Sequence, residues 1–163
     1  MFSRARRLLS VSTSGAGLVA LVLFASPLPA QKATLTLTNA TVTFPAPTAA
    51  DYINGYVDAP TGVTFTLNAT AGASRTTTVF VRATSASLGG GKVLSDLQWR
   101  RSDLANWSAI TTTDVQVEQR VMAKNGANDP WGNTIFFRML LSWTTDAPAA
   151  YTANYVITLS QTP

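Results

Sequence analysis

Apolar and polar side chains alternate along most of this chain, and that alternation constrains its fold more than any other feature. Successive side chains of a β-strand point to opposite faces of the sheet, so a period of two indicates strands with one buried face. The clearest example places Val63, Phe65 and Leu67 on one face. A strand predicted over 134–143 is apolar on both faces, which favours a central position in its sheet.

Gly, Pro and Asn separate these segments at intervals of roughly ten residues. We expect strands over 33–44 (interrupted at Asn39-Ala40), 52–57, 63–67, 76–84, 94–101, 107–113, 114–122, 134–143 and 153–160. Eight or nine short strands predict an all-β fold, an antiparallel β-sandwich of the immunoglobulin-like kind, with a closed barrel as the alternative. A parallel α/β fold is excluded because no segment of helical periodicity connects the strands.

The alternation also predicts which large side chains are buried. Trp99 and Trp143 share strand faces with aliphatic residues, so we expect both in the core. Val115, Val117 and Val121 should face one way in their strand. In the last strand, the inward positions should be those of Tyr155, Ile157 and Leu159.

The first thirty residues have the pattern of a secretory signal peptide. Arginines at positions 4, 6 and 7 precede an apolar run over 15–25, and Ser26-Pro27-Leu28-Pro29-Ala30 offers a small-residue site for cleavage after Ala30. The run is shorter than the roughly 20 apolar residues that span a bilayer, so an uncleaved anchor is the lesser alternative. We therefore expect a cleaved signal helix over 1–30 and a single β-sandwich domain over 31–163, exported by the Sec route rather than the twin-arginine route.

Charge and cysteine content limit the partners and the compartment. Three of the twelve basic residues lie within 1–30, which leaves nine Lys and Arg against eight Asp and Glu. That balance is unsuited to nucleic-acid binding, which depends on many phosphate contacts. The chain has no Cys, so it can hold neither a disulfide nor the lipid of a bacterial lipoprotein. We expect a secreted, periplasmic or cell-surface protein of a bacterial envelope, with no membrane span in the mature chain.

The residue types argue against an enzyme and against a cofactor. Without His and Cys, the chain lacks the usual general base, the thiolate nucleophile and the commonest transition-metal ligands. A Ser-Lys dyad would need Lys92 or Lys124, which lie in loops rich in Gly or Asn. Most carboxylates sit at turns, and Glu118 alone lies inside a strand, where pairing with Arg120 or another Arg is favoured over catalysis. We predict no catalytic, cofactor or metal site; a calcium site over 125–133 is the weaker alternative, because the segment has a single acidic residue.

The two remaining Trp residues lie at loop edges, where an aromatic ring can stack on a sugar. Trp107 and Trp131, together with Asn125, Asn128 and Asp129 of the neighbouring loop, are the candidate ligand contacts. Packing against the loops is the simpler interpretation of both rings.

The end of the chain carries a resemblance to known proteins. The stretch 137–151, with its Asp146-Ala147-Pro148-Ala149-Ala150-Tyr151 turn, leads into the alternating residues 156–159. It is similar to the last hairpin of secreted bacterial sandwich domains, among them spore-coat proteins and fimbrial subunits of the chaperone-usher class. It departs from them at Ala149, where Gly is common, and in having no paired cysteines. The resemblance covers some 25 residues, implies an envelope β-domain and carries over no functional residue.

Together these features predict an exported, non-enzymatic structural or adhesion module, either a homo-oligomer or bound to another envelope protein. Its mechanism would be strand addition, in which the segment 33–44 completes another subunit's sheet. Pairing of that segment within its own sheet is favoured, because a free apolar edge promotes aggregation. The alternative is a binding module for a carbohydrate or small ligand.

Overall fold

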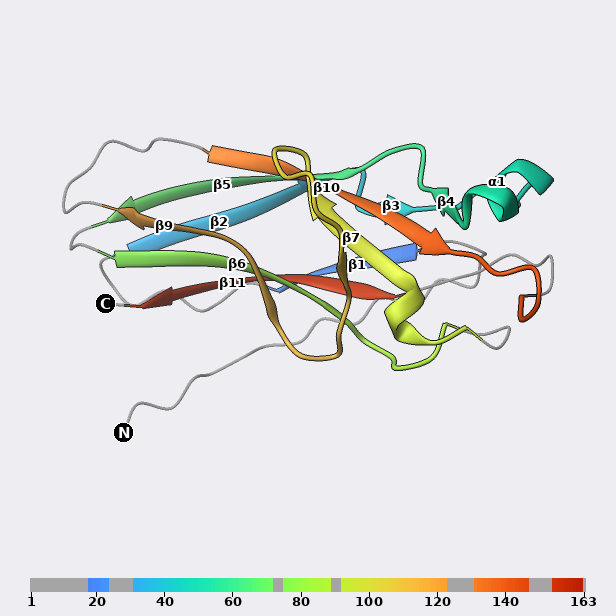
Figure 1. Ribbon diagram of the computed structural model, residues 1–163. Helices are drawn as coiled ribbons and strands as arrows, with labels where there is room; N and C mark the ends of the chain where they lie inside the picture. Colours follow the sequence, from blue (N-terminus) through green and yellow to red (C-terminus); the bar gives the residue numbers. More distant parts are fainter. Residues whose placement is uncertain are drawn as a thin grey trace.

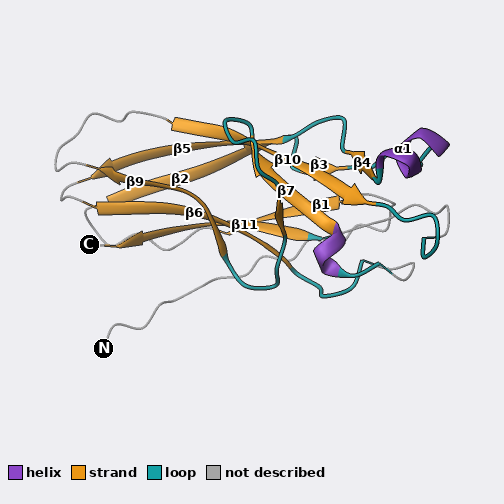
Figure 2. Ribbon diagram, viewed as in Figure 1, coloured by secondary structure: helices purple, strands orange, loops and turns teal. Residues whose placement is uncertain are grey.

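The computed structural model describes residues 18–23, 31–71, 75–88, 92–122, 131–146 and 154–162, and most of them lie in strands (Figure 2). The strands are β1 (Leu18–Leu23), β2 (Gln31–Thr38), β3 (Thr41–Val42), β4 (Tyr56–Asp58), β5 (Val63–Ala71), β6 (Arg75–Ala83), β7 (Leu97–Arg101), β8 (Ser108–Ala109), β9 (Val115–Met122), β10 (Trp131–Leu140) and β11 (Tyr155–Thr162). The short helices are α1 (Ala49–Asn54) and the 3-10 turn η1 (Leu94–Asp96). The prediction of a β-rich fold is confirmed.

The strands form two sheets (Figure 1). The first has the order β2-β5-β10-β7-β8, with β4 also paired to β10, and the second has the order β3-β1-β11-β6-β9. The pairs are antiparallel, apart from β1 with β11, which is parallel. Strand β10 pairs with β4, β5 and β7, which confirms the central position predicted from its two apolar faces.

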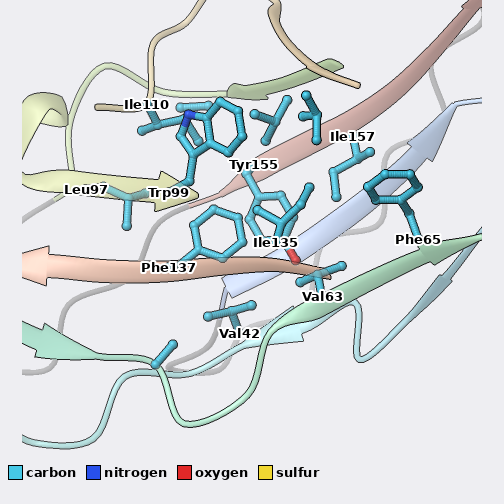
Figure 3. Packing of buried hydrophobic residues seen from close by; sticks show 14 of the residues in the cluster. Val42, Val63, Phe65, Leu97, Trp99, Ile110, Ile135, Phe137, Tyr155 and Ile157 are labelled. Atoms are coloured by element: carbon cyan, nitrogen blue, oxygen red, sulfur yellow. The ribbon is translucent and has the colours of Figure 1, made fainter. Parts of the chain in front are cut away.

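The core lies between the two sheets and draws large apolar side chains from both. Phe137 of β10 and Tyr155 of β11 meet with ring centroids 4.9 Å apart (Figure 3). Val63, Phe65 and Leu67 of β5 are fully buried, as their alternation predicts. Contacts of this kind between facing sheets bury the apolar face of each strand and supply most of the stability of a chain without disulfides.

The chain changes sheets between β2 and β3, at the Asn39-Ala40 interruption. Asn39 adopts a left-handed conformation with φ 56°, which Asn tolerates better than other non-glycine residues. β2 therefore pairs with β5 in the first sheet, and β3 joins the second. The two halves of the segment 33–44 end on opposite sides of the core.

The predicted strand 52–57 is wrong over its first part, which is helix α1. Thr48 and Asp51 form a capping box: the Thr48 hydroxyl accepts from the Asp51 N–H at 3.3 Å, and the Asp51 carboxylate accepts from the Thr48 N–H at 2.7 Å. Gly55, at φ 79°, ends the helix in a left-handed turn. The Thr-x-x-Asp spacing is the local signal that the period-two interpretation overlooked.

Val121 is 76% exposed, contrary to the prediction that it shares a buried face with Val117. The pairing of β6 with β9 shifts at this point, since Val79 pairs with Glu118 and Phe80 with Gln116, leaving Val117 as an extra residue. A bulge of one residue reverses the faces of a strand beyond it. Val121 therefore faces outwards.

The apolar residues 18–23, expected as the centre of a signal helix, form strand β1 here. A run of Leu, Val and Ala fits a strand as well as a helix, and β3 and β11 offer it two rows of backbone hydrogen-bonding groups. No helix within the ranges described is long and apolar enough to cross a membrane.

Candidate functional site

The most distinctive site is the strand position that β1 occupies between β3 and β11. β1 pairs antiparallel with β3 through Leu18 and Val19. Its residues 20–23 pair parallel with residues 155–158 of β11. Both of its edges are therefore bonded to the rest of the protein. The segment that fills this position is the one that the sequence predicts to be cleaved off.

The residues of β3 and β11 that pair with β1 are largely buried, and this determines which side chains a strand in the β1 position needs. Alternate β1 positions 18, 20 and 22 lie in register with Val42, Tyr155 and Ile157, which are 1%, 0% and 0% exposed. Of the intervening positions, 19 lies in register with Thr41, which is exposed, and 21 lies in register with Val156, which is 1% exposed. Partners in register share a face of the sheet, so a strand in this position needs apolar residues at 18, 20 and 22, whereas position 19 tolerates a polar residue.

Strand β2, in contrast, is already used within the domain. It pairs with β5 over eight residues, from Gln31 opposite Ala71 to Thr38 opposite Thr64. For residues 33–38, this is the pairing within the chain's own sheet that the sequence favours. β2 therefore forms the edge strand of this protein's own first sheet and is not available to complete the sheet of another subunit.

Trp107, one of the predicted ligand contacts, is half-buried against basic side chains. The guanidinium carbons of Arg138 and Arg100 lie 4.0 Å and 5.0 Å from its ring centroid. Arg138 also lies 3.8 Å from the ring centroid of Tyr56 and binds the Asp58 carboxylate at 3.1 Å. Cation–π contacts thus hold Trp107 over the outer face of the first sheet.

Trp131, the other predicted ring contact, is 5% exposed. It packs edge-on against Phe65 with centroids 6.1 Å apart, and Arg120 lies 4.7 Å from its ring centroid. Trp131 therefore presents little ring surface to a ligand. The remaining predicted contacts, Asn125, Asn128 and Asp129, fall outside the residues described.

Trp143 is 61% exposed, so the prediction that it lies in the core is wrong. β10 ends at Leu140, and the chain then turns, with the Asp146 N–H donating to the Ser142 carbonyl at 3.1 Å. The indole stacks on Tyr52 of α1 with centroids 4.5 Å apart and 30° between the rings. Ile53, next to Tyr52, is 77% exposed, so two large exposed apolar side chains, Ile53 and Trp143, lie at α1, which Figure 1 places at one end of the molecule. Trp99 is 5% exposed, as predicted.

Glu118 lies in an ion cluster at the open edge of the second sheet. Its carboxylate is 3.4 Å from Arg120 Nε and 3.9 Å from Arg101 Nη1, and its side chain is 12% exposed. Arg101, on β7 of the other sheet, also donates to the Val117 carbonyl at 3.0 Å. This pairing with arginine is the interpretation that the sequence favours over catalysis, and it ties the two sheets together. Inward charges on an edge strand also discourage pairing with other chains.

A second ion cluster, not foreseen from the sequence, joins Lys92 to Asp146. Lys92 Nζ lies 2.5 Å from Asp146 Oδ2 and 3.4 Å from Asp96 Oδ2, and the Lys92 and Asp146 side chains are 3% and 4% exposed. Burial raises the pKa of Asp146, but hydrogen bonds from Lys92 and from the Ser142 N–H outweigh it, so the net direction is downwards. The partners lie 54 residues apart, too far for a local motif to reveal the pair.

The described part of the chain brings no three His, Cys, Asp or Glu side chains together as a metal site. A scan of the sequence against protein-family models gives no match, and a search of the curated proteins gives none either. Any function therefore has to be argued from the residues themselves.

Proposed function

We propose that this protein is an exported, non-enzymatic structural or adhesion subunit of a bacterial envelope, built on an immunoglobulin-like β-sandwich and assembling by strand addition. In this proposal residues 1–30 direct secretion and are cleaved after Ala30. The mature domain then accepts a strand from another copy or from another envelope protein. Its place of action is the periplasm or the cell surface.

The observation that carries the proposal is the pairing of β1 on both edges. Removal of residues 1–30 takes β1 away and leaves β3 and β11 facing one another across a position one strand wide. Two rows of backbone donors and acceptors then lose their partners, and the inner face beside Tyr155 and Ile157 loses its cover. Unpaired strand edges of this kind bind further strands through main-chain hydrogen bonds.

The sequence alone predicts a donor strand in the segment 33–44. The pairing of β2 with β5 uses residues 33–38 within their own domain, and the pairing of β1 between β3 and β11 supports an acceptor there. We therefore keep strand addition as the mechanism and relocate it. The register of β1 supports a donor that is apolar at alternate positions.

The test compares the full chain with a chain that begins at Gln31, and then supplies the missing strand as a peptide of residues 15–30 with a solubilising tag. We expect the shorter chain to be less stable to urea or to form concentration-dependent oligomers, and the peptide to restore a stable monomer. A stable monomer of residues 31–163 that does not bind the peptide would overturn the proposal.

Two peptide variants provide a matched control for specificity. Val22→Asp places a charge in register with the buried Ile157, whereas Val19→Asp places the same charge in register with the exposed Thr41. We expect the Val22→Asp peptide to lose binding and the Val19→Asp peptide to keep it. Equal binding of the two peptides would mean nonspecific apolar association.

A second candidate function, carbohydrate binding, is supported by one observation. Trp143 stacks on Tyr52 and still exposes 61% of its surface, which suits a ring platform for a sugar better than Trp131 does. The test is tryptophan fluorescence during titration with a panel of sugars. Binding that Trp143→Ala removes and Trp107→Ala retains would support this function, and an unchanged spectrum across the panel would eliminate it.

A further inference from the structure

The pair Lys92 and Asp146 joins two segments that are distant in sequence. Lys92 lies just before η1, which leads into β7, and Asp146 lies in the turn that follows β10. Since β7 and β10 are neighbours in the first sheet, the pair connects the start of one strand to the region beyond the end of the other. Both side chains are almost fully buried, at 3% and 4% exposed.

The Lys92 amine and the Asp146 carboxyl group are close enough to react with one another as well as to form an ion pair. Lys92 Nζ lies 2.5 Å from Asp146 Oδ2, so the carboxyl carbon is one covalent bond further on. The Ser142 N–H donates to the same oxygen at 2.7 Å and holds the carboxyl group in place. A second carboxylate, Asp96, lies 3.4 Å from Lys92 Nζ and can exchange a proton with it.

We propose that Lys92 and Asp146 condense to form an intramolecular isopeptide bond. In its neutral form the Lys92 amine attacks Cγ of the protonated Asp146 carboxyl group. The new C–N bond forms, the C–O bond to the hydroxyl breaks, and the hydroxyl leaves as water with a proton taken from the nitrogen. Asp96 accepts that proton and passes it to the departing oxygen. No electron transfer and no other reactant are needed.

Burial favours each part of this reaction. A site with little water disfavours separated charges, so proton transfer within the pair, to a neutral amine and a neutral acid, costs less there than in solution. Fixed proximity replaces a bimolecular encounter and raises the effective concentration of the amine by many orders of magnitude. The pKa of Asp146 is lowered overall, so its carboxylate form predominates over the protonated form that reacts.

The bond would have a clear structural use. A chain without Cys cannot close its loops with disulfides, and an amide between positions 92 and 146 encloses β7, β8, β9 and β10. Closing such a loop restricts the unfolded chain and so favours the folded state. This inference is independent of strand addition, since the pair lies outside the β3–β11 position.

The test is the intact mass of the folded full-length protein after prolonged incubation. We expect a mass lower by one water than the sequence requires, and a proteolytic digest in which the peptides containing Lys92 and Asp146 remain joined. A mass equal to the unmodified sequence, with the two peptides separate, would overturn the proposal. This measurement needs no variant, so it is decisive even where a substitution prevents folding.

Variants then assign the roles. Lys92→Arg keeps the positive charge but has no amine to condense, so we expect the unmodified mass. Asp96→Asn keeps the size of the side chain but removes the proton acceptor, so we expect the lower mass to appear more slowly, by at least tenfold. If Lys92→Arg retains the loss of one water, the loss arises elsewhere and the assignment is wrong.

Discussion

The hydroxyl of Tyr155 donates a 2.8 Å hydrogen bond to the carbonyl of Ala40. Tyr155 begins the last strand and is fully buried, whereas Ala40 lies at the point where the chain passes from β2 in one sheet to β3 in the other. Burial raises the pKa of the Tyr155 phenol, so it stays protonated and remains a donor. This bond fixes the crossing between sheets against β11, and it lies beside the strand position that β1 occupies.

Tyr155→Phe should therefore destabilise the protein. The substitution keeps the ring that packs on Phe137 and removes only the donor to Ala40, at a cost of about 1–2 kcal/mol in the free energy of unfolding. Urea denaturation measures this loss. Tyr52→Phe is the matched control, because the buried Tyr52 hydroxyl has no hydrogen-bond partner among the described residues, and its loss should be neutral or stabilising. Equal effects of the two substitutions would show that the Ala40 bond does not stabilise the fold.

Asp103 should retain its charge in acid. Its hydrogen bond from Arg101 lowers the pKa of Asp103 from the ordinary 3.8 to about 2, even though its carboxylate is open to solvent. A carboxyl group with a depressed folded pKa stabilises the fold above its unfolded pKa, and this contribution is lost as the pH falls from 3.8 through about 2. NMR titration of the carboxyl carbon should report the low value.

The same pair predicts how a substitution depends on pH. Asp103→Asn should be less stable than the natural chain near neutral pH, and this difference should shrink below pH 3.8 and disappear as the pH falls through about 2. Unfolding midpoints of both proteins across this range provide the measurement. A difference that is independent of pH would mean that the stabilisation comes from packing rather than from the charge.

Gly132 of β10 should not tolerate a methyl group. It pairs with Thr66 of β5, and a Cβ there would collide with the Phe65 carbonyl oxygen. Gly132→Ala should cost about 1–3 kcal/mol, because the backbones must separate. Gly55→Ala is a useful comparison: space is available there, with the nearest atom 3.9 Å away, but φ is 79°, so its cost of about 1 kcal/mol is conformational. Thermal unfolding should rank Gly132→Ala as the more damaging.

The regular strands could be predicted because their alternation is local. Val63, Phe65 and Leu67 alternate within one strand, and their burial follows from the sequence alone. Val121 could not be placed, because the bulge at Val117 depends on how β9 aligns with β6. Trp143 could not be placed either, because β10 ends before it, where Asp146 and Ser142 close a turn. Alternation describes a strand but does not say where the strand ends.

The candidate site was harder to predict, for a related reason. The apolar run 15–25 has a composition that suits both a signal peptide and a strand. Only the pairing with β3 and β11 shows that its residues 18–23 form a strand. The contact between Lys92 and Asp146 joins residues 54 positions apart, so nothing in the neighbouring sequence indicates it. Glu118 is the opposite case. Its position inside a strand, near Arg120, was enough to predict an ion pair.

Glu118→Gln should lower stability and leave no catalytic defect. The carboxylate lies between Arg120 and Arg101 and is mostly buried, so its neutralisation removes both ion pairs at the place where the two sheets meet and should cost about 1–3 kcal/mol, although Arg101 keeps Asp103 as a partner. Urea denaturation gives the loss, and assays on glycoside and ester substrates of the natural protein and the variant should agree. Gln116→Ala, on the exposed face of the same strand, is the control and should change stability by less than about 0.5 kcal/mol. Hydrolytic activity in the natural protein that disappears in Glu118→Gln, with stability unchanged, would instead give Glu118 a catalytic role.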